Sequence, residues 1–164
     1  MSTIVLPEIQ VVPYKAEYAE LFRILNETWI KKYFFLEASD IWTLNNPESA
    51  IINKGGFILV ALFNSKPVGV CALIPHGTAC YELTKLAVDE YLRGKGIGKL
   101  LVHAAIVKAK QLNAESIHLY SNTKLEPAIS LYKKIGFVEV ACCSSHYERC
   151  NIQMHFSLTS DHHE

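Results

Sequence analysis

Three glycines and three cations lie within seven residues of the sequence, in the stretch RGKGIGK. An apolar, strand-like run precedes them and a helical pattern follows. Glycines let a backbone approach its ligand closely, and the first N–H groups of a helix point at a bound anion. Cationic side chains add charge-assisted hydrogen bonds. The stretch therefore predicts a phosphate-binding turn, here called the phosphate turn, made of Arg93, Gly94, Lys95, Gly96, Ile97, Gly98 and Lys99.

Two common phosphate-binding patterns fail here at a residue that their chemistry needs. A P-loop places Ser or Thr after its lysine to hold magnesium, but Leu100 follows Lys99. A dinucleotide fingerprint needs a third glycine where Lys99 stands. The pattern that fits is R-x-x-G-x-G, carried by Arg93, Gly96 and Gly98. A glycine-rich turn with ordinary surface lysines is the alternative.

The segments LAVDEYLRGKGIGKLL and NTKLEPAISLYKKIGF together resemble the GNAT superfamily of acyl-CoA-dependent N-acetyltransferases. The first looks like that family's motif for the pyrophosphate of acetyl-CoA, and the second like its A-x-x-L-Y-x-x-x-G-F ending. The resemblance implies an α/β (α+β) GNAT fold. Its centre is a mixed, mostly antiparallel twisted sheet of about seven strands, flanked by about four helices.

The resemblance also implies a set of cofactor contacts. The backbone of Leu86, Ala87 and Val88 would face the pantetheine arm of acetyl-CoA, while the phosphate turn wraps the pyrophosphate. A backbone N–H near Leu86 would polarise the thioester carbonyl. Asn122 would touch pantetheine from the other side. The sequence departs from the family at Leu125, where many relatives have asparagine.

Acetyl transfer to an amine needs a neutral amine, a polarised carbonyl and a proton for the departing thiolate. Tyr132 matches the family's proton donor to the CoA sulfur, and packing in the core is its alternative role. Glu82 resembles the glutamate that some members use as a base. Period-two alternation puts it on the same strand face as Thr84 and Leu86. Orienting the substrate, or lying solvated on the strand, are the alternatives for Glu82.

The family usually shapes its acceptor pocket with the first helical region and the last hairpin. Here the first region supplies four aromatic residues, which we expect to be mostly core: Tyr33, Phe34, Phe35 and Trp42. His146 and Arg149 of the hairpin could meet a substrate carboxylate, but a mobile polar loop is favoured slightly.

Hydrophobic periodicity predicts alternating elements along one domain that spans residues 1–164. We expect strands at 9–14, 80–88, 115–121, 137–143 and 151–158, a hairpin at 56–76, and helical segments at 16–34, 39–53, about 97–112 and 127–136.

The composition indicates which kinds of binding partner and which cellular compartment to expect. Lys+Arg and Asp+Glu are both 16, which argues against a nucleic-acid partner. We expect no signal peptide and no membrane span, and therefore a cytoplasmic protein. Five cysteines without C-x-x-C spacing suit reduced thiols. We expect no metal site, neither at Cys142 and Cys143 nor in the closing DHHE. No cysteine is expected beside a base.

The function that follows is N-acetyl transfer from acetyl-CoA, as co-substrate, to a primary amine by direct attack in a ternary complex. A catalytically idle acyl-CoA-binding or sensor module is the alternative from another class. The acceptor stays open among small-molecule and peptide or protein amines. The apolar last strands leave a monomer or a homodimer open.

Overall fold

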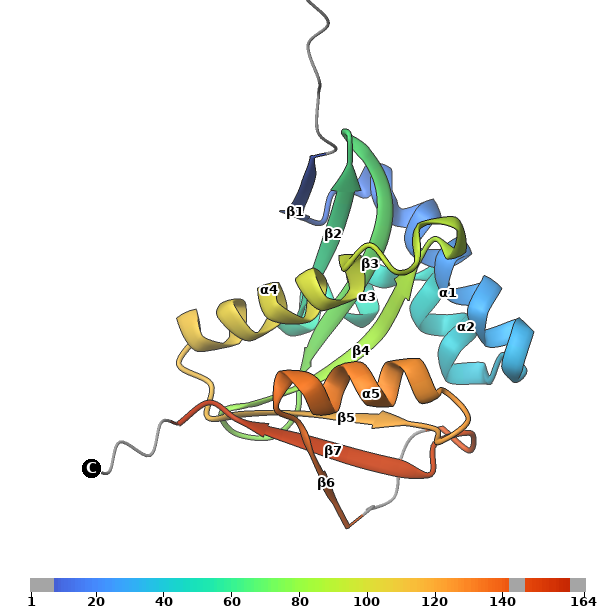
Figure 1. The fold of residues 1–164 in the computed structure, drawn as a ribbon. Coiled ribbons are helices and arrows are strands. Elements are labelled where there is room, and N and C mark those ends of the chain that lie inside the picture. The colour runs from blue at the N-terminus through green and yellow to red at the C-terminus, as the bar shows by residue number, and fades with distance from the viewer. Residues whose placement is uncertain (1–7, 142–146, 160–164) are drawn as a thin grey trace, which may run out of the picture.

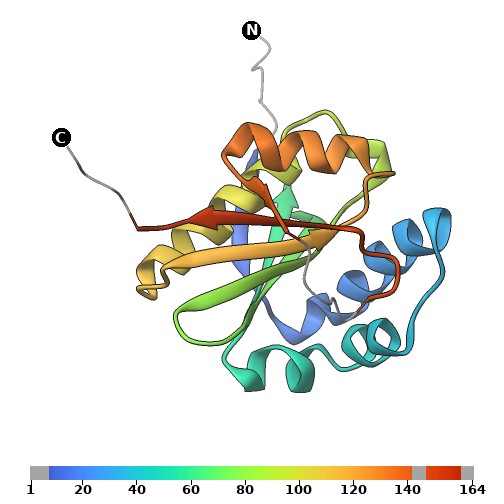
Figure 2. The same ribbon diagram turned by 90° about the horizontal axis from the view of Figure 1, so that it is seen from below.

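The computed structural model describes residues 8–141 and 147–159, which form one seven-stranded sheet with helices on both faces (Figure 1, Figure 2). The strand order is β1-β2-β3-β4-β5-β7-β6. Every neighbouring pair is antiparallel except β4 and β5. The mixed, mostly antiparallel sheet confirms the predicted fold class. The strands are β1 (Ile9–Pro13), β2 (Phe57–Phe63), β3 (Lys66–Pro75), β4 (Cys80–Val88), β5 (Ser116–Ser121), β6 (Val138–Val140) and β7 (Ile152–Ser157).

Two helical layers cover the sheet, as the view from below shows (Figure 2). One layer holds α1 (Ala19–Tyr33), α2 (Ala38–Asn45) and the single turn α3 (Pro47–Ala50). The other holds α4 (Ile97–Gln111) and α5 (Glu126–Ile135). The 3-10 turns are η1 (Ala16–Tyr18), η2 (Ile52–Lys54) and η3 (Glu90–Leu92). The broken helical segment expected at 39–53 is therefore α2, α3 and η2.

Alternation along β3 divides the core between these layers. Val70 and Ala72 pack toward α1, while Cys71 and Leu73 pack toward α4. The spacing of apolar residues predicts a buried face of α4 made of Ile97, Leu100, Leu101, Ala104 and Ala105. Ile97, Leu101 and Ala105 are buried, whereas Ala104 is half-buried and Leu100 is 38% exposed. In the described part of the chain, no helix is long and apolar enough to cross a membrane.

Strands β4 and β5 pair over only part of their length. Their parallel ladder joins Cys80–Glu82 to Ser116–His118, although both strands continue beyond it. Within the described residues, nothing of β5 pairs with β4 after Glu82. The two strands therefore part, and the sheet has a split at its centre.

A β-bulge in β4 changes which side chains face each layer. Lys85 has φ of 57°, and the register with β3 shifts there. Thr84 pairs with Ala72 and so faces the α1 layer, whereas Leu86 packs in the α4 layer. The prediction that Glu82, Thr84 and Leu86 share one face is therefore wrong for Leu86, because the extra residue reverses the alternation.

A buried group of charges joins α2 to the bulge and to the segment before β7. Asp40 Oδ1 accepts from Lys85 Nζ at 3.0 Å, and its two oxygens accept from Arg149 at 2.6 and 2.9 Å. Glu37 also accepts from Arg149, at 3.2 Å, and Lys85 Nζ lies 2.9 Å from the Tyr147 hydroxyl. These five side chains, here called the charge network, tie together three distant parts of the sequence.

Asp40 is the centre of the network, and its pKa reflects its surroundings. Burial by itself raises the pKa of this carboxyl, but the hydrogen bond from Arg149 and the charge of Lys85 outweigh it and lower the pKa below its usual 3.8. A carboxylate with a lowered pKa stabilises the fold above the pKa of the unfolded chain. That stability is lost as the pH falls through the folded value.

We expect Asp40→Asn to lower the free energy of unfolding by about 3–5 kcal/mol at pH 7, because it leaves two buried cations without their counter-charge. The difference from wild type should shrink as the pH falls below about 4, because the unfolded wild-type chain then takes up a proton that the folded Asp40 carboxylate, with its lowered pKa, still excludes. Denaturant unfolding of the wild type and of Asp40→Asn between pH 7 and pH 3 measures the difference in free energy of unfolding and its pH dependence. Glu20→Gln, which changes a carboxylate that is 77% exposed, serves as the control and should change stability little. An equal difference at pH 7 and pH 3 would contradict the role of the ion pair.

Candidate active site

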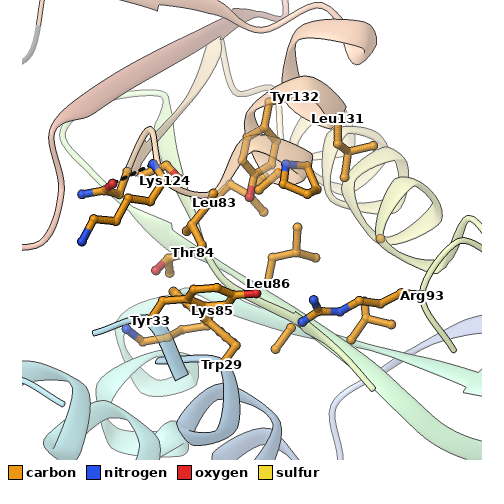
Figure 3. A pocket seen from close by; sticks show the side chains of 18 of the residues that line it. Trp29, Tyr33, Leu83, Thr84, Lys85, Leu86, Arg93, Lys124, Leu131 and Tyr132 are labelled. Carbon is orange, nitrogen blue, oxygen red and sulfur yellow. Dashed lines mark hydrogen bonds between the residues drawn. The ribbon is translucent and has the colours of Figure 1, made fainter. Parts of the chain in front are cut away.

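A cavity of about 500 Å³ lies in the split between β4 and β5. The side chains of α5 line one wall and those of α1 line the opposite wall, with β4 between them (Figure 3). Tyr132 and Leu131 project from the first wall, and Trp29 and Tyr33 belong to the second (Figure 3). Both helical layers therefore contribute side chains to the wall of the cavity.

Most of the residues predicted for the site line this cavity. They come from the end of β4, the phosphate turn, the second half of α5 and the loop after β5. The predicted residues in its wall are Leu86, Ala87, Val88, Arg93, Gly94, Gly96, Ile97, Gly98, Lys99, Asn122 and Tyr132. Lys95 and Glu82 are not among the lining residues.

The phosphate turn owes its shape to backbone conformations that favour glycine. Gly94 and Gly96 have φ of 82° and 80°, in the left-handed region. Gly96 is the N-cap of α4, and its carbonyl accepts from Leu100 N at 3.0 Å. The first turn of α4 thus begins at the cavity, with its N–H groups available for an anion.

Tyr132 lies at the junction of the core and the cavity. Its side chain is buried, and its ring packs against Phe137 at 5.7 Å. Burial, with a smaller contribution from Cys71, raises the pKa of Tyr132 well above its usual 10.0. The phenol therefore keeps its proton at neutral pH.

Glu82 lies at the point where β4 and β5 separate. It is 4% exposed, pairs with Ile74 of β3, and forms the last rung of the β4–β5 ladder with His118. Its neighbours Leu83 and Thr84 line the cavity, but Glu82 itself does not. The carboxylate thus lies next to the cavity, beyond the first layer of its wall.

The Asn122 side chain holds the loop after β5. Its Nδ2 donates to the Arg149 carbonyl at 2.6 Å, and its Oδ1 accepts from Lys124 N at 2.8 Å. Both polar ends of the amide are thus engaged within the protein. Leu125, the position that departs from the family's pattern, is the N-cap of α5 and lines the cavity.

The four aromatic residues of the first helical region were predicted to lie mostly in the core, but they line the cavity or are exposed to solvent. Tyr33 and Phe34 line the cavity, whereas Phe35 and Trp42 are 67% and 53% exposed. The expectation that most of them are core is therefore wrong, because Tyr33 and Phe35 lie at and just after the end of α1 and Trp42 lies on an exposed side of α2. Trp29 was not singled out. Its position one helical turn before Tyr33 is the signal that could have found it.

The wall opposite α5, here called the acceptor wall, consists of Trp29, Tyr33, Phe34, Tyr147 and Arg149. The Arg149 guanidinium lies 4.4 Å from the Tyr147 ring centre and is held by the charge network. The preference for a mobile loop is thus wrong for Arg149. The predicted residue His146 lies outside the described residues, as do Cys142, Cys143 and the closing DHHE.

Cys80 Sγ lies 3.1 Å from His118 Nδ1. The expectation that no cysteine stands beside a base is therefore wrong. A strand and its parallel neighbour bring the two side chains together, which sequence spacing does not reveal. Neither residue lines the cavity.

Comparison with known proteins identifies the family of this chain. The family model of the acetyltransferase (GNAT) family matches residues 18–137. An uncharacterized N-acetyltransferase of Bacillus subtilis, YvbK, is 34% identical over 104 residues, which cover 62% of this chain and 67% of that protein. Two further relatives are matched over 40% and 54% of their own length.

Solved structures show the same fold. A GNAT-family acetyltransferase from Staphylococcus aureus Mu50 superposes with a TM-score of 0.84 at 26% identity, over 93% of this chain and 100% of that one. The PaiA N-acetyltransferase from Thermoplasma acidophilum, solved in complex with coenzyme A, superposes with a TM-score of 0.71 at 20% identity, over 92% and 99%.

The split sheet, the phosphate turn at the start of α4 and the family match lead to one assignment. This chain belongs to the GNAT family and is an acyl-CoA-dependent N-acetyltransferase.

Proposed function

We propose that this protein transfers the acetyl group of acetyl-CoA directly to a primary amine while both substrates occupy the cavity. The observation that carries the proposal is the cavity itself. It joins the phosphate turn, the unpaired part of β4 and the Tyr132 side chain in one space that α1 closes from the opposite side.

Acetyl-CoA would lie along β4, beyond the point where β4 separates from β5, with its pyrophosphate in the phosphate turn. The edge of β4 that faces β5 has no ladder partner there after Glu82, in the described part of the chain. Pantetheine can therefore take the hydrogen bonds that β5 would otherwise take, along Leu86, Ala87 and Val88. A backbone N–H near Leu86 would stabilise the oxyanion that forms during attack.

The two proton transfers would take place on opposite sides of the thioester. The amine nitrogen attacks the carbonyl carbon, the C–S bond breaks, and the thiolate takes the Tyr132 phenolic proton. The position of Tyr132 in the cavity wall supports this role. Burial keeps the phenol protonated before the reaction, although the raised pKa also makes it a weaker acid. The same pKa makes the resulting phenolate a strong base that quickly regains a proton from solvent.

Glu82 would take the proton that the amine must lose, acting through water. Its place on the α1 face at the root of the split supports this role, because that face adjoins the acceptor wall. Its separation from the cavity by the first layer of the wall favours a water-mediated transfer over direct contact.

The acceptor wall suggests which amines to try first. Its aromatic side chains offer apolar surface, and Arg149 is engaged by Asp40 and Glu37. An amine that carries an apolar or aromatic group therefore fits this wall better than an acidic one. Release of free CoA thiol against a panel of aromatic, aliphatic, acidic and peptide amines tests the function. Failure of every amine to release thiol would favour an acyl-CoA-binding module.

We expect CoA to raise the Tm of the wild type and Gly96→Asp to abolish this shift, because a carboxylate would meet the pyrophosphate at the start of α4. Gly77→Asp is the matched control: Gly77 also has positive φ, at 69°, and open space at its Cβ, but it does not line the cavity. Equal CoA shifts in wild type and Gly96→Asp would remove the pyrophosphate assignment.

We expect Tyr132→Phe to lower kcat by about 100-fold with nearly unchanged CoA affinity, because only the proton for the thiolate is lost. Steady-state kinetics and a CoA titration measure the two quantities. Tyr81→Phe removes a phenol from β4 outside the cavity and should leave both unchanged. Weaker CoA binding with normal turnover would make Tyr132 a packing residue.

We expect Glu82→Gln to lower the rate by roughly 100-fold near pH 7 and to recover partly toward pH 9. An alkyl amine with a pKa near 10 becomes available without a base as the pH rises. The pH–rate profile with the best amine of the panel measures this effect, and the exposed Glu115→Gln is the control. A higher KM without recovery at high pH would indicate substrate positioning instead.

A further inference from the structure

A second group of chemically active side chains lies at the far end of β4, outside the cavity. It consists of His76, Glu82 and His118, whose ligand atoms all lie within 4.8 Å of one another. His76 lies in the turn directly after β3, Glu82 lies on β4 and His118 on β5, so two paired strands and the adjoining turn supply one residue each. Such a cluster of two imidazoles and one carboxylate has the donor set of many zinc sites.

The backbone fixes this cluster before any ligand binds. Glu82 and His118 are directly paired on the parallel ladder. The His76 N–H donates to the Cys80 carbonyl at 2.9 Å, which closes the turn between β3 and β4. The His76 ring meets the His118 ring edge-on, with centres 4.4 Å apart. Small side-chain movements therefore suffice to bring the three ligand atoms around one ion.

His118 points independently to a ligand. Its side chain is 6% exposed, and Nε2 is the one buried side-chain nitrogen or oxygen without a hydrogen-bond partner in the described residues. Its other ring nitrogen, Nδ1, lies 3.1 Å from Cys80 Sγ. A metal-binding histidine typically uses one nitrogen for the ion and the other for a second-shell partner, which is the pattern seen here.

We propose that His76, Glu82 and His118 bind a zinc ion through His118 Nε2, a His76 ring nitrogen and the Glu82 carboxylate. Water completes the coordination. His76 is exposed, which gives the ion a path from solvent, while the other two ligands are buried. His155 pairs with His118 across β5 and β7 and adds a further imidazole beside the site. The proposal runs against the expectation of no metal, which considered only the cysteines and the closing DHHE.

The test is zinc binding by the untagged full-length protein after treatment with chelator, in the absence of acetyl-CoA. We expect one equivalent of Zn²⁺ to bind and to raise the Tm, and Co²⁺ to give the visible absorption of a histidine-bound ion. His76→Ala should weaken zinc binding by more than about 100-fold. Because His76 is exposed and outside the cavity, this variant should fold and should still respond to CoA.

Two controls separate this site from other histidines. His103→Ala changes an exposed histidine of α4, and His162→Ala with His163→Ala changes the pair near the end of the sequence. Both should bind zinc like the wild type. The proposal fails if zinc leaves the Tm unchanged, if His76→Ala binds as the wild type does, or if binding is lost with His162 and His163. Glu82→Gln is not used alone, since Glu82 also belongs to the proposed reaction.

Discussion

The separation of β4 from β5 after Glu82 is the constraint on which the site depends. Two parallel strands that stayed paired would close the sheet and leave no room between the helical layers. Here β4 keeps its ladder with β3 but bulges at Lys85, and the Lys85 side chain is bonded to Asp40 of α2. A left-handed conformation at a non-glycine residue costs free energy, and the buried ion pair helps to offset it. The cavity thus forms where β4 gives up its pairing with β5 while its Lys85 side chain contacts Asp40 in the α1 layer.

The charge network fixes one wall of the cavity without making it strongly charged. Two carboxylates, Glu37 and Asp40, face two cations, Lys85 and Arg149, so the formal charges of the group cancel. Buried ion pairs of this kind add little net stability compared with apolar packing, but their geometry is specific. The network can therefore hold the segment before β7 in one position, where Tyr147 and Arg149 complete the acceptor wall. Specific geometry, more than stability, explains why charged residues occupy this interior.

Strand β4 serves two chemical environments at once. Its C-terminal half carries the backbone and side chains of the cavity, and its N-terminal half carries the carboxylate of the histidine cluster. Glu82 lies at the boundary, on the last rung before the strands part. A zinc ion held there would withdraw the carboxylate from proton transfer, so metal content and acetyl transfer would be coupled through one side chain. The coupling would follow from the topology, because the split begins where the cluster ends.

The sequence by itself determined most of the elements and the glycine-rich turn before α4, because these depend on patterns among near neighbours, and the resemblance of two motifs to the GNAT family gave the fold class. Strand β4 was predicted with its observed ends, and the glycines of the turn have the positive φ angles that their side-chain-free backbones permit. Tertiary structure alone decided the bulge at Lys85, since lysine carries no local preference for that conformation. It also decided the partners of Arg149 and the meeting of His76 with His118. Those contacts join residues far apart in sequence, and only the packing of strands and helices brings them together.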